Sequence, residues 1–167
     1  MKKLLLFSAC IILALSSCKK DSPKTTNSTG ITATIGGSDF NFSTAATAQV
    51  IAVSGLYSIQ IIGSNGAGSS AQGVSISIQS DKPIIKGTYS VADATPFTDI
   101  TYVENTSVST PVSFSSNTVG TVTITSISNT NVQGTFSGVL VSNQDNVTTK
   151  TLSNGKFNVS VITTKQQ

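Results

Sequence analysis

The chain has 167 residues with ten lysines, seven acidic residues and a net charge of +3, and it contains no histidine and no arginine. Without those two residue types, Ser-His-Asp and Cys-His catalytic sites, zinc–histidine sites and arginine clamps are excluded. Half of the lysines lie within the first 24 residues, so the rest of the chain carries five lysines against six acidic residues. A basic footprint for nucleic acid is therefore absent, and we expect no nucleic-acid partner.

The first 18 residues have the three parts of a bacterial export signal. Two lysines at positions 2 and 3 precede an apolar stretch over 4–15, which is shorter than the roughly 20 residues that a transmembrane helix needs. The tetrapeptide Leu15-Ser16-Ser17-Cys18 that follows resembles the lipobox of bacterial lipoproteins. That resemblance implies cleavage before Cys18 and a diacylglycerol on its thiol. The alternative is an ordinary secretory signal beside an incidental cysteine.

We accordingly divide the chain into a cleaved signal peptide at 1–17, a lipidated cysteine with a flexible tether at 18–30, and one domain at 31–167. The tether is polar throughout and has no apolar side chain to bury, and it can extend to roughly 40 Å. Cys10 leaves with the signal, so the mature chain has no second cysteine for a disulfide. About 140 residues suffice for one domain held together by its core and its backbone hydrogen bonds.

The anchor also predicts a place in the cell. Mature lipoproteins resemble one another in carrying three fatty chains such as palmitate, which makes attachment to the membrane effectively permanent. Lys19 follows the cysteine, and by resemblance to the enterobacterial sorting rule this favours the outer membrane. The start CKKD at 18–21 is similar to that of Bacteroidota surface lipoproteins. Both the periplasmic and the surface-exposed face of the cell envelope stay open.

Past the tether, apolar residues recur with a period of two. Val74, Ile76 and Ile78 alternate with polar residues, which places each apolar set on one face of a sheet. We predict an all-β domain with almost no helix, an antiparallel β-sandwich of about ten short strands in meander or Greek-key order; the alternative is a small antiparallel β-barrel. The expected strands are 31–35, 39–43, 48–53, 57–61, 74–79, 84–91, 100–104, 111–115, 120–127, 132–141, 147–152 and 156–162.

Turn residues predict two hairpins near the end of the chain. Residues 128–131 are expected to connect two strands, and 153–155 to connect the last two. We favour a three-residue turn with Gly155 left-handed, because this register keeps Lys150 off the core side. The same register places Leu152 on the outer face.

Four short motifs, in this order behind a lipoprotein start, resemble a family of small Bacteroidota lipoproteins of unknown function. The resemblance covers most of the domain, but its motifs are turn and strand features and imply no catalytic or binding residue. The motifs are GTY at 87–89, GTVTI at 120–124, GTF at 134–136 and NGKF at 154–157.

Few residues are candidates for chemistry. Asp93 and Asp99 flank a loop and Glu104 follows the next strand, so the three could converge as oxygen ligands for calcium or as hydrolytic carboxylates. No Asp-x-Asp-x-Asp spacing supports a calcium loop, and we interpret them as solvated residues. Ser153 and Lys156 have the spacing of some acyl-transfer enzymes, which require both residues on one helical turn. We therefore predict no metal site, no cofactor and no enzyme activity.

The aromatic residues bear on ligand binding. Tyr57, Tyr89 and Tyr102 are in phase with apolar neighbours and are expected in the core, whereas Phe97 beside Pro96 is the best candidate for an exposed contact. We predict a membrane-anchored envelope lipoprotein whose domain is a non-catalytic interaction or scaffolding module. The alternatives are a surface-exposed glycan-binding or adhesion module and, third, a carboxylate-based hydrolase.

Overall fold

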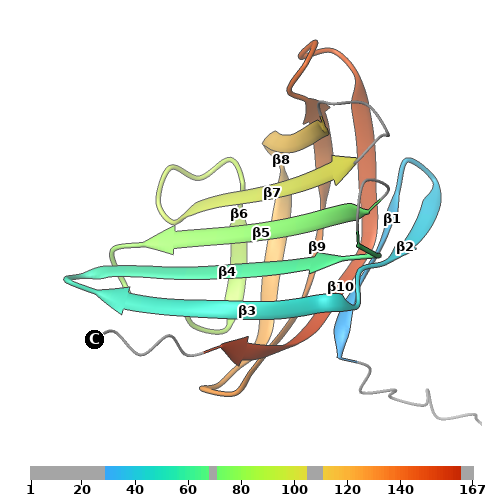
Figure 1. Cartoon of the computed structure of the whole chain (residues 1–167). Coiled ribbons are helices and arrows are strands. Elements are labelled where there is room, and N and C mark those ends of the chain that lie inside the picture. Colours follow the sequence, from blue (N-terminus) through green and yellow to red (C-terminus); the bar gives the residue numbers. More distant parts are fainter. Residues whose placement is uncertain (1–28, 68–70, 105–110, 163–167) are drawn as a thin grey trace, which may run out of the picture.

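The computed structural model describes residues 29–67, 71–104 and 111–162, and in these ranges it contains ten strands and no helix (Figure 1). The predicted all-β class and sandwich arrangement are confirmed. The signal peptide, Cys18 and nearly all of the tether lie outside the described residues. The strands are β1 (Gly30–Ile35), β2 (Ser38–Asn41), β3 (Thr44–Val53), β4 (Leu56–Ser64), β5 (Gln72–Ser80), β6 (Gly87–Ser90), β7 (Phe97–Glu104), β8 (Val112–Ile127), β9 (Asn131–Ser142) and β10 (Thr149–Ile162).

The strands form two layers. The front layer has the order β3-β4-β5-β7 and the back layer the order β6-β8-β9-β10-β1-β2, and in Figure 1 the front strands run across the back strands. The layers are joined by hydrogen bonds at two corners, where 101–104 of β7 pair with 112–115 of β8 and 160–162 of β10 pair with 47–49 of β3. The β10–β3 pairing is parallel, and the other described pairings are antiparallel. Strands that pass from one layer to the next in this way are typical of sandwiches with crossed layers.

The core lies between the two layers and is built by the alternating pattern read from the sequence. Each fully buried Val, Leu, Ile or Phe side chain contributes about 1.5–3 kcal/mol relative to an exposed one. The hydrophobic residues that are no more than 3% exposed in the front layer are Ala48, Ile59, Ile61, Val74, Ile76, Ile78, Ile100 and Tyr102; those in the back layer are Ile31, Ile35, Phe114, Val122, Ile124, Val132, Phe136, Leu140, Leu152, Phe157 and Val159.

The predicted hairpin at 153–155 is wrong, because β10 runs through these residues as one strand of 14. The register against β9 shifts between Leu152 and Gly155, and Asn154 has a positive φ of 53°. Asn and Gly suit a β-bulge as well as a turn, since both tolerate unusual backbone angles. The bulge turns Leu152 inward to 1% exposure and brings Lys150 to the same side of the strand. Both expectations for these side chains are thereby corrected.

Two other strands differ from the prediction. The segments 111–115 and 120–127 form one long strand, β8, with an irregularity between Ser116 and Gly120 that lets it belong to both a corner and the back layer. The strand expected at 84–91 is limited to β6. The hairpin at 128–131 is confirmed, with Ile127 opposite Val132.

Gly134 shows why the back layer needs a glycine in β9. A Cβ atom at this position would collide with the carbonyl oxygen of Thr123 and with the ring of Phe157. Phe157 lies opposite Gly134 in the β9–β10 ladder, and its ring packs 6.3 Å from that of Phe136. The glycine therefore makes room for a phenylalanine on the neighbouring strand of its own layer.

Candidate functional site

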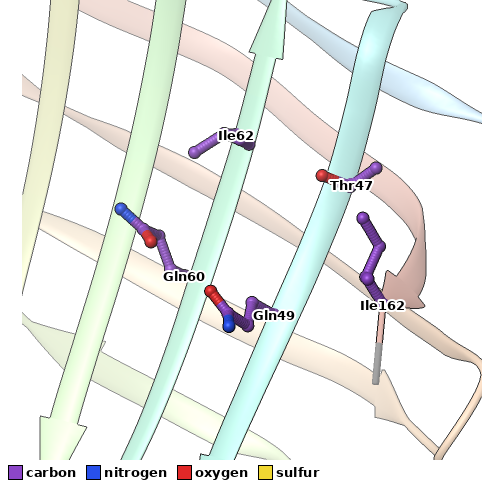
Figure 2. Close-up of a pocket in the computed structure, with 5 residues that line it drawn as sticks. All are labelled: Thr47, Gln49, Gln60, Ile62 and Ile162. Atoms are coloured by element: carbon purple, nitrogen blue, oxygen red, sulfur yellow. The ribbon is translucent and has the colours of Figure 1, made fainter. Parts of the chain in front are cut away.

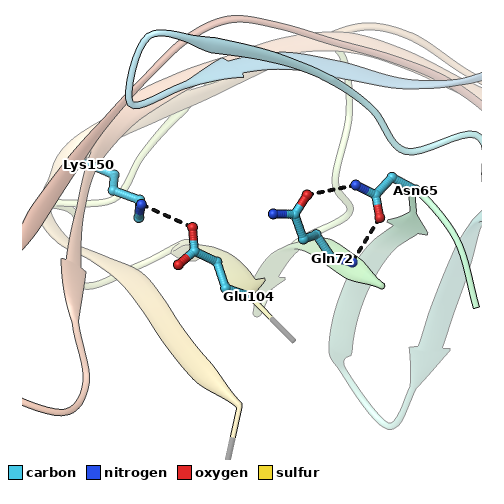
Figure 3. Close-up of polar contacts among 4 residues, drawn as sticks. All are labelled: Asn65, Gln72, Glu104 and Lys150. Atoms are coloured by element: carbon cyan, nitrogen blue, oxygen red, sulfur yellow. Dashed lines mark hydrogen bonds and ion pairs between the residues drawn. The ribbon is translucent and has the colours of Figure 1, made fainter. Parts of the chain in front are cut away.

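Charged side chains from both layers meet at one end of the space between them. Glu104 is the last residue of β7 and Lys150 the second residue of β10, and Lys150 Nζ lies 3.0 Å from Glu104 Oε1 (Figure 3). The two side chains are 25% and 27% exposed. Lys150 Nζ also lies 4.9 Å from the centroid of the Phe114 ring. Because both side chains are partly buried and the lysine contacts the ring, we expect this pair to contribute about 1 kcal/mol, at the upper end of the range for surface ion pairs.

Two amides continue the polar group along the front layer. Gln72 lies opposite Glu104 in the β5–β7 ladder. The Asn65 side-chain amide donates to Gln72 Oε1 at 2.7 Å, and the Gln72 backbone N–H donates to Asn65 Oδ1 at 2.8 Å (Figure 3). We call Asn65, Gln72, Glu104 and Lys150 the polar mouth. The polar mouth thus consists of two separate pairs, one held by hydrogen bonds and one by an ion pair.

Aromatic rings lie beneath the polar mouth. Tyr102 is fully buried, with ring centroids 5.8 Å from Phe40 and 6.2 Å from both Phe42 and Phe114. Its hydroxyl makes no hydrogen bond of standard geometry with the described residues, although the Glu104 carboxylate lies near it. Burial raises the pKa of Tyr102 well above its ordinary value, and the Glu104 carboxylate raises it further through its charge and its attraction for the hydroxyl proton. The hydroxyl therefore stays protonated and is unsuited to act as a base.

A second feature is a shallow groove of about 180 Å³ on the outer face of the front layer. Figure 2 shows its lining at the corner where the end of β10 meets β3. Ile62 and Ile162 supply its apolar side, with 44% and 54% exposure. The residues that line it are Thr47, Gln49, Gln60, Ile62 and Ile162.

The groove opens onto a row of polar side chains that crosses the front layer. Gln49 lies opposite Gln60, Gln60 opposite Ser77, and Ser77 opposite Asp99. The Thr101 hydroxyl donates to Asp99 Oδ2 at 2.8 Å. We call Gln49, Gln60, Ser77 and Asp99 the polar row. Amide, hydroxyl and carboxylate groups side by side can donate to and accept from a ligand rich in hydroxyl groups.

The structure does not bring the three candidate carboxylates together. Asp99 and Glu104 are five positions apart on β7, so they point to opposite faces of the front layer and lie about 17 Å apart along the strand. Asp93 is exposed in the turn after β6. Among residues 29–67, 71–104 and 111–162 no three His, Cys, Asp or Glu side chains are close enough to hold a metal ion. Asp99 and Glu104 fail to converge because an odd number of residues separates them along β7, and successive side chains of a strand point to opposite faces.

The serine–lysine pair also lacks the geometry of a catalytic site. Ser153 and Lys156 lie in β10, beside the bulge at Asn154, and not on a helical turn. Sequence reasoning missed the contact between Lys150 and Glu104, because the assumed hairpin turned the lysine away from the core. Reading Asn154 as a bulge would have placed Lys150 on the core side.

Two of the four aromatic predictions are confirmed. Tyr102 is in the core, whereas Tyr57 and Tyr89, also expected there, are half-buried. The Tyr89 hydroxyl donates to the Ile85 carbonyl at 2.6 Å and accepts from the Ile85 N–H at 3.0 Å. Phe97 is 52% exposed, as predicted.

Asp145 organises the connection between β9 and β10. It accepts hydrogen bonds from the Thr148 hydroxyl at 2.5 Å and from the backbone N–H groups of Val147 and Thr148, each at 3.0 Å. These bonds, that of the Thr148 hydroxyl first, hold the pKa of Asp145 well below its usual range. Its role is to shape the turn.

In comparisons with known proteins, no family model, curated protein or solved structure matches the chain. The resemblance to small Bacteroidota lipoproteins therefore stays a prediction. None of the described segments forms a helix with the length and apolar character needed to cross a membrane.

Proposed function

We propose that the protein is a cell-envelope lipoprotein, held in the outer membrane by fatty chains on Cys18, and that its β-sandwich is a non-catalytic interaction module. The observation that carries the proposal is the tetrapeptide ending at Cys18, directly behind a short apolar stretch with two lysines before it. A polar tether of about a dozen residues then separates the anchor from the first strand.

The arrangement of the polar groups supports the non-catalytic part of the proposal. In the polar mouth, Glu104 is paired with Lys150 and Asn65 with Gln72. A hydrolytic pair of carboxyl groups would have to flank one bond at a separation of about 5–10 Å. Asp99 and Glu104 face opposite sides of their strand, so they do not meet this requirement.

Mass spectrometry of the mature protein tests the anchor. The wild type is expected to begin at Cys18 and to carry the added mass of a diacylglycerol and an amide-linked acyl chain, and it should enter the detergent phase on phase separation. Cys18→Ser should keep the signal peptide and lack the added mass. Cys10→Ser is the matched control and should be processed and lipidated like the wild type. An unmodified wild-type protein cleaved elsewhere would refute the anchor.

The non-catalytic assignment needs its own test. The triple variant D93N/D99N/E104Q should reproduce every phenotype that distinguishes the wild type from a strain lacking the gene. A folded triple variant that behaves like the deletion strain would show that carboxylate chemistry matters. Protease added to intact cells separates the two possible locations, because only a surface-exposed domain is digested.

A second candidate, a glycan-binding module, is favoured by the polar row and the groove beside it. Sugar hydroxyls pair well with neighbouring amide and carboxylate groups. The test is titration calorimetry of the wild type and of Gln60→Ala with polysaccharides of the envelope and growth medium. Gln133→Ala, exposed on the back layer, is the matched control. Absence of binding across the whole polysaccharide panel would remove this candidate.

A further inference from the structure

The end of the front layer where β3 turns into β4 lies at the left in Figure 1, and it carries exposed apolar side chains. In the described residues, ten large apolar side chains are exposed, and five of them lie on the strand ends that meet here. We call these five the apolar tip. They are Val50 at 39% exposure, Ile51 at 37%, Val53 at 38%, Leu56 at 51% and Phe97 at 52%.

Strand register places most of the apolar tip on the outer face of the front layer. Val53 lies opposite Leu56 at the closed end of the β3–β4 hairpin. Two residues inward, Ile51 begins a row of opposed residues that passes through Ser58 and Gln79 and ends at Phe97 on β7.

The hairpin projects past the back layer. Val50 lies opposite the buried Ile59 and points to the inner side of the front layer, yet it is 39% exposed. The two turn residues Ser54 and Gly55 have φ values of 51° and 83°. A tight two-residue turn with both φ values positive matches the twist of the strands that it joins. The apolar tip is therefore a well-defined protrusion whose side chains meet solvent.

The tether has the length needed to bring the apolar tip to the anchor. Gly30, where the domain begins, packs against Ser43, the residue just before β3. From there β3 runs about 30 Å to Val53. The segment from Cys18 to Gly30 spans at most roughly 40 Å. Cys18 and the apolar tip can therefore both reach the membrane surface when β3 is oriented perpendicular to it.

We propose that the apolar tip docks into the interfacial region of the bilayer that holds the fatty chains of Cys18. This inference rests on the lipid anchor of the proposed function. The anchor confines the domain to within about 40 Å of the bilayer, so even a weakly inserting hairpin meets the surface at a high local concentration. A soluble partner has no such advantage.

The charges around the apolar tip indicate how it would dock. Asp81 and Lys82 directly follow β5, whose last residue Ser80 lies opposite Tyr57 next to Leu56. These two charges cancel, so headgroup attraction contributes little. Docking is driven by burial of apolar side chains and should be insensitive to salt.

A fluorescent probe on the full, acylated chain tests the inference. Leu56→Cys introduces a thiol that is the only free one in the mature protein, because Cys18 is acylated and Cys10 leaves with the signal. The variant is labelled with nitrobenzoxadiazole and reconstituted into vesicles of phosphatidylethanolamine and phosphatidylglycerol at less than one protein per vesicle. Val147→Cys, 78% exposed in the β9–β10 connection, is the matched control, and Val53→Cys repeats the test at the tip.

We expect the probe at Leu56 to emit at shorter wavelength than the probe at Val147. We also expect spin-labelled lipid to quench it more strongly, by a factor on the order of three, at low and high salt alike. Equal quenching at the two positions in acylated protein would overturn the docking but leave the anchor in place. A shift that needs several copies per vesicle, without quenching by lipid, would assign the tip to a second copy and also overturn it. Protein without the acyl mass would overturn both the anchor and the docking.

Discussion

Tyr102→Phe should stabilise the protein, although most substitutions in a core destabilise. The hydroxyl of Tyr102 is fully buried and makes no hydrogen bond of standard geometry with the described residues, while its ring packs against Phe40, Phe42 and Phe114. Phenylalanine keeps the ring and removes only the oxygen. The substitution therefore tests what an unpaired hydroxyl costs in this core.

The magnitude follows from that missing bond. A buried polar group without a partner costs about 1–3 kcal/mol, and the proximity of Glu104 offsets part of this cost. We expect the free energy of unfolding to rise by about 1 kcal/mol, which for a domain of this size raises Tm by roughly 3–5 °C.

Urea unfolding followed by far-UV circular dichroism provides the measurement, with equal slopes required for both proteins. Tyr89→Phe is the matched control: it removes the same atom, but there the hydroxyl makes two hydrogen bonds with Ile85. The control should lose about 1 kcal/mol. If Tyr102→Phe were instead less stable than the wild type, the hydroxyl would have to be hydrogen-bonded in the folded protein, and the reasoning would fail.

Three further predictions concern pH and packing. The pKa of Tyr102 is higher in the folded than in the unfolded chain. The free energy of unfolding should therefore fall as pH rises above about 10, by up to 1.4 kcal/mol per pH unit. In Tyr102→Phe this pH dependence should be smaller. Gly134→Ala should cost about 2 kcal/mol or more in urea unfolding, because the new methyl group meets the ring of Phe157; an unchanged midpoint would contradict the close packing. In an NMR titration Asp145 should stay ionised well below the usual range of its pKa, and Thr148→Val should raise that pKa; identical titration curves would show that the hydroxyl does not hold the carboxylate.

The alternation of apolar and polar residues was enough to predict the class of fold and most of the core. Val74, Ile76 and Ile78 fall on the buried face of β5, as the period of two requires. The segment at 153–155 could not be resolved in the same way. Asn-Gly is compatible with a turn and with a bulge, and only the partner strand, β9, decides between them.

The polar mouth was hidden for the same reason. A slip of one residue in a strand moves every side chain to the other face, so the wrong choice at Asn154 also misplaced Lys150. Glu104 was named as a candidate ligand beside Asp99. The sequence alone could have excluded this pairing, because residues five positions apart on one strand point to opposite faces. The groove at Ile162 depends on a parallel pairing between β10 and β3, and local sequence carries no signal for such a long-range contact.

Closure of the back layer joins the two ends of the domain. β1, the first strand, takes its place against β10, the last, with Ile31 opposite Phe157 and Ile35 opposite Leu152. In the export route that we propose, the amino end leads, and the short strand β2 is then the one partner of β1 until β10 has emerged. The back layer cannot close before that point, so on this route folding is completed after transport.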